Sequence, residues 1–290
     1  MRPDLVQASE LLRKNTPEAI EEAIGLLQNT VFSFSMKMCG HREDAEDTMQ
    51  DVLFRSLKHL SKVQEPNALA AWLYTVTRNR CRRIRRGQRE IPGKKLSLDE
   101  LIPDDEELRY LLLDINRGPE QDAIHAEQHH FLHKAVLRIP TSLRMVLVLH
   151  DMEELTSEQI ADILDLQLGT VRVRLHRARL AVRKEMGVLL SGVPERSTSV
   201  RRVKVDRPKE CRELFANLSE YIDARVEQHT CEQMKAHIER CPACIAFLKD
   251  LRIAVNRCRS FEVACDPDVA RRMRKLMTEE YRRLIGTPME

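Results

Sequence analysis

The residues best suited to chemistry are a histidine and two cysteines toward the C-terminal end of the chain. They occur as His237-Ile-Glu-Arg-Cys241-Pro-Ala-Cys244. On a helix, His237 and Cys241 lie one turn apart on the same face, and Cys244 is reached around the Cys-Pro turn. Imidazole nitrogen and thiolate sulfur are preferred zinc ligands, and a closed structural site holds four of them in a tetrahedron. The spacing therefore predicts a Zn²⁺ site that needs one more ligand.

The fourth ligand has two candidates, Cys211 and, as the weaker choice, Cys231. Cys211 stands just before a helix that we predict over residues 213–226. A unit of this size struggles to close a core without a metal, so zinc can serve the fold. Alternatively, the thiolates can sense oxidants or metals and release zinc as they form a disulfide. Four protein ligands leave no open position for water, which argues against a metal-dependent hydrolase.

The segment from Thr156 to Lys184 predicts two short helices joined by a tight turn. Thr156 can cap the first helix while Gln159, three residues later, reaches back in a capping box. Asp165 occupies the turn, where Asp tolerates left-handed backbone better than most residues do. Apolar residues at spacings of four, three and four predict the buried face of the second helix: Val171, Leu175, Ala178 and Val182. This arrangement is that of a helix-turn-helix, which indicates DNA binding.

The second helix of this pair is rich in basic residues. Its other faces carry Arg172, Arg174, Arg177, Arg179, Arg183 and Lys184, with no acid between residues 172 and 184. A helix in a major groove uses its first turns for base edges and its flanks for phosphates. The predicted readers are Thr170, Arg172, Val173, Arg174, His176 and Arg177. A solvated basic face is the competing interpretation, but the capped partner helix and the turn spacing favour DNA contact.

Three helices around one apolar seam are predicted in the first 90 residues, over residues 17–38, 43–60 and 67–86. The third combines aromatic rings with a cationic end, through Trp72, Tyr74, Arg78, Asn79, Arg82, Arg83 and Arg86. Unpaired DNA presents ring faces and backbone charge, so these residues are predicted to bind a melted strand. Burial of Trp72 in the core is the competing interpretation for that residue.

The second of these helices carries acidic and amide side chains on its outer face, at Asp44, Glu46, Asp47, Gln50 and Asp51. Paired acids can bind metals or transfer protons, but no histidine cluster or glycine-rich phosphate loop accompanies them. A surface that docks on another protein, or one that is only solvated, is therefore favoured over an active site.

Composition and charge set the domain plan. A chain of 290 residues suits two or three domains, and 4% aromatic residues with nine glycines favour helices, so we expect an all-α fold. Seven arginines lie between residues 78 and 89, whereas residues 99–107 hold six acids and no base. Such segregation indicates separate surfaces with separate partners. The expected domains are residues 1–90, 123–187 and 210–262, separated by an acidic linker at 91–122 and a second linker at 188–209, with an amphipathic tail at 263–290.

The expected compartment is the cytoplasm. No stretch approaches the roughly 20 apolar residues that a membrane span requires, and the N-terminal residues lack the apolar core of a signal peptide. In that compartment, eight cysteines are expected to be thiols or metal ligands and not structural disulfides.

Residues 17–187 together resemble the sigma factors of bacterial RNA polymerase, specifically the compact extracytoplasmic-function (ECF) type. Asp44-Ala45-Glu46-Asp47 with Gln50-Asp51 is similar to the helix that docks on the clamp coiled coil of the polymerase. Ala71-Trp72-Leu73 with Arg78-Asn79 is similar to the helix that captures the melted downstream promoter element. Leu137-Arg138-Ile139-Pro140, Glu158-Ile160-Ala161 and the run from Gly169 to Arg179 are similar to the domain that reads the upstream element.

Two residues depart from that family's usual pattern. Asp165 stands where the family usually has glycine, and Val173 stands where it often has a small polar residue. Val173 could contact a thymine methyl group, so these departures affect the promoter sequence that is read and not the class of protein.

The C-terminal cysteines resemble a zinc-binding anti-sigma domain, whose pattern is a leading cysteine followed by His-x-x-x-Cys-x-x-Cys. Cys211, followed by Leu214, Leu218, Tyr221 and Asp223, fits the first half of it. The resemblance implies a sigma factor without catalysis of its own, with Zn²⁺ on Cys211, His237, Cys241 and Cys244. It implies RNA polymerase core enzyme and promoter DNA as partners. The fusion itself, with a linker of roughly 20 residues that can reach back to a neighbouring domain, motivates the hypothesis that the zinc unit contacts the sigma domains and controls them in cis.

Two other functions are compatible with the same residues. A helix-turn-helix transcriptional regulator with a metal-sensing or redox-sensing tail would bind duplex promoters without polymerase. Alternatively, the zinc unit would bind a separate protein and would not restrain the DNA-binding domains.

Overall fold

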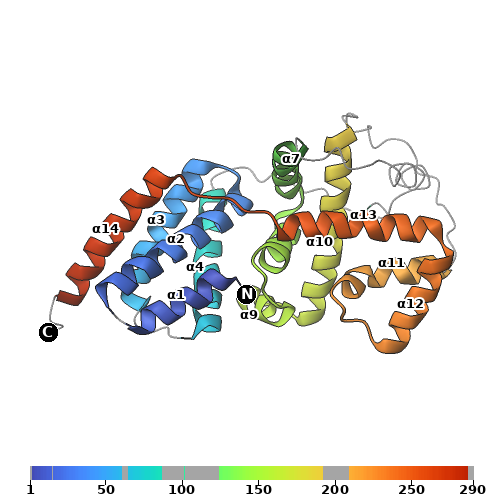
Figure 1. Cartoon of the computed structure of the whole chain (residues 1–290), viewed down its shortest axis with the longest axis horizontal. Helices are drawn as coiled ribbons and strands as arrows, with labels where there is room; N and C mark the ends of the chain where they lie inside the picture. Colours follow the sequence, from blue (N-terminus) through green and yellow to red (C-terminus); the bar gives the residue numbers. More distant parts are fainter. Residues whose placement is uncertain are drawn as a thin grey trace. The chain divides into compact units, whose positions relative to one another are not determined.

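The computed structural model describes residues 2–14, 16–60, 65–86, 101, 124–191 and 209–286, and every regular element in these ranges is a helix (Figure 1). The expected all-α fold is thereby confirmed. The acidic linker at residues 91–122 lies outside the described residues apart from Leu101, as does most of the second linker. The described helices fall into two compact units, each assembled from separate stretches of the chain.

The first unit is built around α2 (Pro17–Cys39). Thr16 caps this helix by accepting a hydrogen bond from the Ala19 N–H, and Gly40 ends it in left-handed backbone with φ of 80°. Around it pack α1 (Pro3–Lys14), α3 (Arg42–Leu60) and α4 (Pro66–Arg86). The three helices expected here are confirmed to within about one residue at each end.

Helix α1 is not among the helices that the sequence predicts. Its apolar side chains Leu5, Ala8 and Leu12 are buried, and their spacing of three and four residues places them on one helical face. Contacts of α1 with α2 and α4 complete the apolar centre of the unit.

The C-terminal helix α14 (Pro267–Gly286) also belongs to the first unit, where it packs on α2 and α3. Met277 and Tyr281 supply the buried face of this amphipathic helix. Gly25 on α2 permits the close approach, because a Cβ there would lie 3.1 Å from Nε of Arg274. The expected amphipathic tail is therefore a helix, and the structure adds where it packs.

One further stretch of the first unit comes from the middle of the sequence. It contains a single turn of π-helix, η1 (Val148–Met152), and the short helix α9 (Ser157–Leu164), which contacts α4. The predicted capping box is present, with Gln159 N–H donating to Thr156 Oγ1 and Thr156 N–H donating to the Gln159 side chain. Asp165 ends α9 with φ of 54°, as the turn prediction required.

The second unit contains α7 (Ile124–Arg138), α8 (Thr141–Leu147), α10 (Leu168–Ser191) and a group of three helices, α11 (Lys209–Ile222), α12 (Gln228–Arg240) and α13 (Pro242–Arg259). The predicted stripe of α10, Val171, Leu175, Ala178 and Val182, is buried. Phe215 of α11 and Phe247 of α13 pack edge to face with ring centroids 5.0 Å apart. None of the described helices of either unit is long and apolar enough to cross a membrane.

Candidate zinc centre and nucleic-acid surfaces

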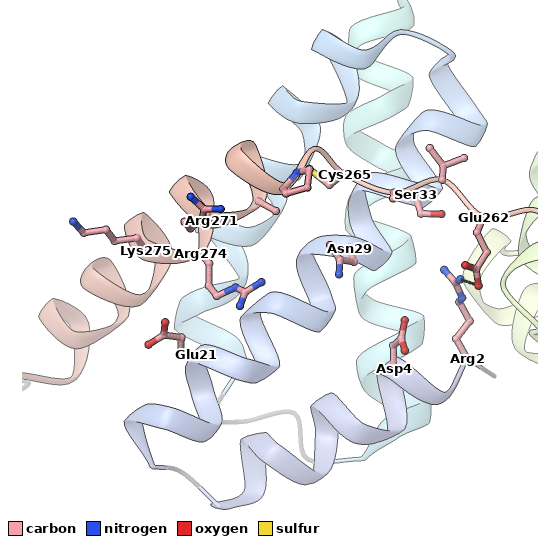
Figure 2. A pocket seen from close by; sticks show the side chains of 14 residues that line it. Arg2, Asp4, Glu21, Asn29, Ser33, Glu262, Cys265, Arg271, Arg274 and Lys275 are labelled. Atoms are coloured by element: carbon pink, nitrogen blue, oxygen red, sulfur yellow. Dashed lines mark ion pairs between the residues drawn. The ribbon is translucent and has the colours of Figure 1, made fainter.

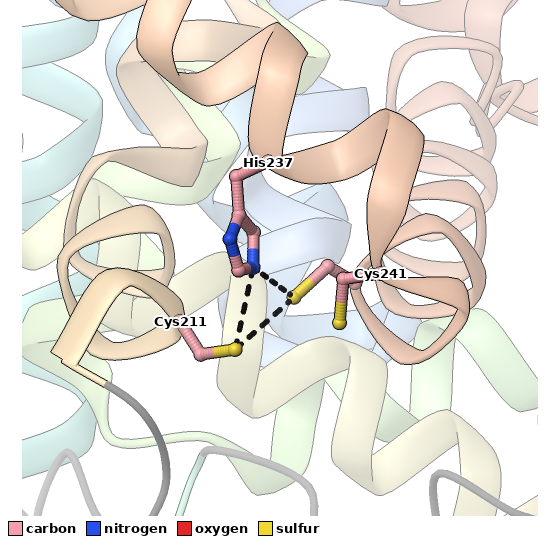
Figure 3. Close-up of side chains that lie close together, drawn as sticks. Cys211, His237 and Cys241 are labelled. Carbon is pink, nitrogen blue, oxygen red and sulfur yellow. Dashed lines mark hydrogen bonds between the residues drawn. The ribbon is translucent and has the colours of Figure 1, made fainter.

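The four predicted zinc ligands converge at the junction of α11, α12 and α13 (Figure 3). Cys211 lies in the first turn of α11, His237 in the last turn of α12, Cys241 at the junction of α12 and α13, and Cys244 in the first turn of α13. The sequence predicts Cys211 just before this helix, but α11 begins at Lys209, so Cys211 lies on the helix. The ligand atoms of the four residues all lie within 4.8 Å of one another. Cys231 is not in this group, so Cys211 is the better of the two candidates.

The distances between the ligand atoms fit a tetrahedral zinc ion. With Zn–S bonds of about 2.3 Å and Zn–N bonds of about 2.0–2.1 Å, a tetrahedron requires S···S separations of about 3.8 Å and S···N separations of about 3.5 Å. The Cys211 and Cys244 sulfurs are 3.8 Å apart. His237 Nε2 is 3.3 Å from the sulfur of Cys211 and 3.3 Å from that of Cys244. The residues therefore fit zinc in both type and spacing.

The two cysteines of the Cys-Pro turn differ in acidity. Burial raises the pKa of Cys244, with a further contribution from its hydrogen bond to Cys241. Burial also raises the pKa of Cys241, but hydrogen bonds to its thiolate outweigh this effect and lower the pKa overall. These bonds come from the backbone and side chain of Cys244, from the Cys211 thiol and from the Ala243 N–H. Zinc binds thiolates, so a bound Zn²⁺ would supply the charge that keeps both sulfurs deprotonated.

The predicted base readers on α10 are mostly accessible. Arg172, Val173 and Arg177 are exposed, with Val173 at 53%, while Thr170 and Arg174 are partly exposed. His176 differs, because it is only 8% exposed and its Nδ1 lies 3.3 Å from the Ser219 hydroxyl of α11. Burial, together with the charges of Arg179 and Arg177, lowers the pKa of His176 to about 4. In this conformation His176 is a neutral residue packed against the zinc unit and does not face solvent.

Arg179 and Arg183, which the sequence places on the basic faces of α10 outside its apolar stripe, are buried. Arg179 is 1% exposed and donates to both carboxylate oxygens of Asp223, each at 2.9 Å. Arg183 donates to Asp250 at 2.7 Å and lies over the Phe247 ring, 4.9 Å from its centroid. Both arginines are therefore covered in this structure, because acidic side chains of the zinc unit pair with them, and neither belongs to an exposed basic face.

The predicted strand-binding face of α4 is also partly covered. Tyr74 is 1% exposed, and its hydroxyl donates to the Glu153 carboxylate at 2.7 Å, so this ring lies in the core and not on a stacking surface. Trp72 is half-buried, with its ring 5.8 Å from that of His59. Asn79 and Arg83 are exposed, and Arg78 donates to the Ile163 carbonyl of α9. Arg82 and Arg86 lie in α4, but their side chains are outside the described part of the chain.

The predicted polymerase-docking residues line the outer side of α3. Asp47 and Gln50 are exposed, and Asp44, Glu46 and Asp51 are partly exposed. Ion pairs restrain several of them. Arg42 contacts Glu46 at 2.9 Å and Asp266, just before α14, at 3.4 Å, while Asp51 contacts Arg55 at 3.0 Å and Arg80 at 3.4 Å. This arrangement leaves Asp47 and Gln50 as the most accessible members of the set.

A groove of about 700 Å³ runs between the C-terminal segment and the first two helices (Figure 2). One side is formed by Arg2, Asp4, Glu21, Asn29 and Ser33, and the other by residues from Glu262 to Lys275. Ser33 and Arg274, which line this groove, each have a buried polar atom that makes no hydrogen bond to any residue that the structure describes. The contact between α14 and α2 is thus polar and less completely packed than the centre of the unit.

Sequence reasoning missed the acidic partners Asp223, Asp250 and Glu153. The sequence identifies Asp223 only as part of the zinc-domain pattern, and it gives no role to Asp250 or Glu153. Glu153 lies in a mostly apolar stretch that includes Leu147, Val148 and Leu149, which is a weak signal for burial. No local spacing identifies the basic partner of any of these acids, because the partner lies far away in the sequence.

Comparison with known protein families locates three domains in the chain. Residues 24–91 match sigma-70 region 2, residues 132–182 match sigma-70 region 4, and residues 211–244 match a zinc-finger family. Their order and positions agree with the two DNA-binding segments and the zinc centre described above.

Characterised relatives match between about half and two thirds of the chain. The ECF RNA polymerase sigma factor SigW of Bacillus subtilis is 25% identical over 177 residues, which is 60% of this chain and 92% of the relative. The RNA polymerase sigma-H factor of Pseudomonas aeruginosa is 26% identical over 187 residues, 63% of this chain and 94% of the relative. The ECF sigma-E factor of Escherichia coli K12 is 26% identical over 147 residues, 51% of this chain and 76% of the relative.

Proposed function

Since this chain is a sigma factor of the ECF type with a zinc-finger domain fused behind its region 4, we propose that it is held inactive in cis by that domain. Region 2 and region 4 direct transcription initiation at promoters. The partners are then the RNA polymerase core enzyme and promoter DNA, which places the activity in the cytoplasm. The protein contributes recognition and strand opening, whereas the polymerase contributes catalysis.

The observation that carries this proposal is the pairing of Arg179 with Asp223. The guanidinium is fully buried in a bidentate contact, and Arg259 adds a third bond to Asp223 at 2.9 Å. The same α10 side that buries Arg179 also buries His176 against Ser219. Helix α10 cannot present these side chains to a DNA backbone while α11 covers them, so the contact is incompatible with full use of the helix in a major groove.

Zinc is proposed to keep the covering surface in shape. Cys211 fixes the start of α11, the helix that carries Ser219 and ends just before Asp223, to the junction of α12 and α13. Loss of zinc, whether by chelation or by oxidation of the thiolates, would release α11 from that junction. The domain would then lose the geometry that pairs Asp223 with Arg179.

The C-terminal helix extends the same control to region 2. Helix α14 covers part of α2 and α3, and Asp266 pairs with Arg42, one turn from the docking residue Glu46. An interface with unsatisfied polar groups is more easily separated than an apolar one, because water can replace the missing hydrogen bonds. This suits a cover that has to leave when the polymerase binds.

The test is run-off transcription with core polymerase and three proteins: the full chain, a truncation after Gly187, and a truncation after Phe261 that removes only α14 and its connecting residues. The proposal expects the longer deletion to raise transcription most and the shorter one to raise it in part. Zinc should repress the full chain, while chelator or peroxide should activate it and leave the truncation after Gly187 unaffected. Equal or lower activity of the truncation after Gly187 would exclude inhibition in cis.

A further inference from the structure

A buried carboxylate from the region 4 sequence lies among region 2 side chains. Glu153 is 0% exposed, and its Oε1 accepts a hydrogen bond from Lys37 Nζ of α2 at 2.7 Å. Its Oε2 accepts from the Tyr74 hydroxyl of α4 at 2.7 Å and lies 3.5 Å from the Arg2 guanidinium. We call these four residues, Arg2, Lys37, Tyr74 and Glu153, the Glu153 cluster.

The cluster has the composition that a buried charge requires. An isolated carboxylate or ammonium is costly in the interior, whereas a paired and hydrogen-bonded one is tolerated. Lys37 is also 0% exposed, so each of the two charges has the other as its neutralising partner. Burial and the Glu153 carboxylate raise the pKa of Tyr74 well above its ordinary value, which keeps the phenol protonated and able to donate.

The backbone before α9 is shaped to direct Glu153 inward. Its N–H donates to the Val148 carbonyl across the π-helical turn at 2.9 Å, and Leu155 N–H donates to the Leu149 carbonyl at 3.0 Å. Glu154, between them, adopts left-handed backbone with φ of 58° and is exposed. Two adjacent glutamates therefore have opposite environments, one inside region 2 and one in solvent.

The same stretch places α9 over the face of α4 that carries the strand-binding residues. Arg78 donates to the Ile163 carbonyl at the end of α9, and Gln159 donates to Asn67 at the start of α4 at 2.8 Å. In a sigma factor, region 2 binds the melted downstream element while region 4 binds a separate upstream element. The α9–α4 contact occupies Arg78 and holds the two domains together, so it opposes simultaneous binding of both elements.

We propose that the Glu153 cluster is a direct lock between region 4 and region 2, which has to open before both promoter elements can be bound. All four of its members lie outside the zinc unit. The lock therefore restrains the chain independently of the cis inhibition proposed above. The occupant of the Lys37 and Tyr74 site is this chain's own Glu153, and opening leaves Lys37 and Arg2 without their carboxylate.

Glu153→Gln tests the lock, with Glu154→Gln as the matched control that removes the same charge from the neighbouring exposed position. Hydrogen exchange is followed by mass spectrometry in the full-length, zinc-loaded protein. The expected result for E153Q is exchange at least about tenfold faster in α9 and in the first turns of α4, with α11 to α13 unchanged. E154Q should match the wild type. Equal acceleration throughout α1 to α4 would show that the cluster only supports the fold of region 2 and would overturn the proposal.

A cross-link provides a second measurement if E153Q does not fold. Asn67→Cys with Gln159→Cys should be joined by a short bismaleimide cross-linker in the otherwise unchanged chain, with the cross-link located by peptide mass spectrometry, because the hydrogen bond between the Asn67 and Gln159 side chains keeps the two positions within reach of a short spacer. Its yield should fall several-fold when Glu153→Gln is added and should not change with Glu154→Gln. Absence of this cross-link in the otherwise unchanged chain would overturn the lock. Run-off transcription by the full chain separates the two proposals, since E153Q should raise activity further even after a chelator has removed zinc from the zinc unit.

Discussion

Replacing Asp223 with Asn removes one charge from the contact between α10 and the zinc unit while keeping the size of the side chain. In the wild type, both oxygens of Asp223 accept from Arg179, and the Arg179 side chain is 0% exposed. Asparagine offers one acceptor oxygen and turns an amide N–H₂ toward the guanidinium. The variant therefore leaves a buried positive charge without its neutralising partner.

The expected effect is large because the pair is buried. Removing one member of a buried ion pair costs about 3–5 kcal/mol, and we expect the lower end because Asn keeps one hydrogen bond. A loss of about 3 kcal/mol corresponds to a more than 100-fold shift toward the state in which α10 is uncovered. Glu220→Gln is the matched control in the last turn of α11, three residues before Asp223, since Glu220 pairs with Arg172 at 3.9 Å with side chains 39% and 44% exposed. Such a pair contributes about 0–1 kcal/mol.

The assay combines hydrogen exchange with run-off transcription on zinc-loaded full-length protein. D223N should exchange faster at the α10 and α11 amides and should initiate transcription without chelator, whereas E220Q should behave as the wild type in both measurements. Circular dichroism and zinc content verify that D223N retains its helices and metal. If D223N and E220Q have the same effect, or if D223N uncovers α10 without raising transcription, then burial of Arg179 is not what restrains the protein.

Three further outcomes follow from the structure. Atomic absorption should show one zinc ion bound per chain. Cys241→Ser should abolish zinc binding and lower the helical content, which far-ultraviolet circular dichroism measures. Full zinc occupancy in C241S would show that Cys241 is not a ligand. His176 has its pKa lowered to about 4 in the folded state, so its contribution to stability is complete above pH ~6.5 and is lost as the pH falls toward about 4. Denaturant titrations should therefore show that H176Q loses about 2 kcal/mol less than the wild type between pH 7 and pH 5, and equal losses would contradict the buried neutral imidazole. Thr156→Ala should lower the free energy of unfolding by about 1 kcal/mol, because the helix cap is lost. Asp165→Ala should also cost about 1 kcal/mol, whereas Asp165→Gly should be tolerated, because φ at this position is 54°. Thermal melts in which alanine is tolerated at both positions would refute these local arguments.

Local features of this protein followed from the sequence, because they depend on residues within one or two helical turns. The capping box of Thr156 and Gln159, the left-handed turn at Asp165 and the stripe of α10 all appear as predicted. The candidate zinc ligands His237, Cys241 and Cys244 span only eight residues, so their convergence is set by one helix end and one turn. The sequence does not predict helix α1, because its apolar pattern extends over only 12 residues and lies outside the resemblance to region 2.

The sequence could not assign the partners of the buried charges. Arg179 and Asp223 are 44 positions apart, and Lys37 and Glu153 are 116 positions apart. A run of arginines predicts a basic surface, but it does not distinguish arginines that face solvent from those that meet an acid of another helix. The same limit applies to Tyr74, whose type suited base stacking while its position in α4 directs it to Glu153.

The sequence by itself determined the helical class, the two sigma domains and a candidate set of ligands for zinc, because each is recorded in short-range spacing. Only the tertiary structure decided which of the basic and aromatic side chains are covered. Asp223 pairs with Arg179 of α10, Glu153 accepts from Tyr74 of α4, and α9 contacts Arg78 of α4. The physical reason is that a buried charge is stable only beside its partner, and the partner is brought there by packing of distant segments.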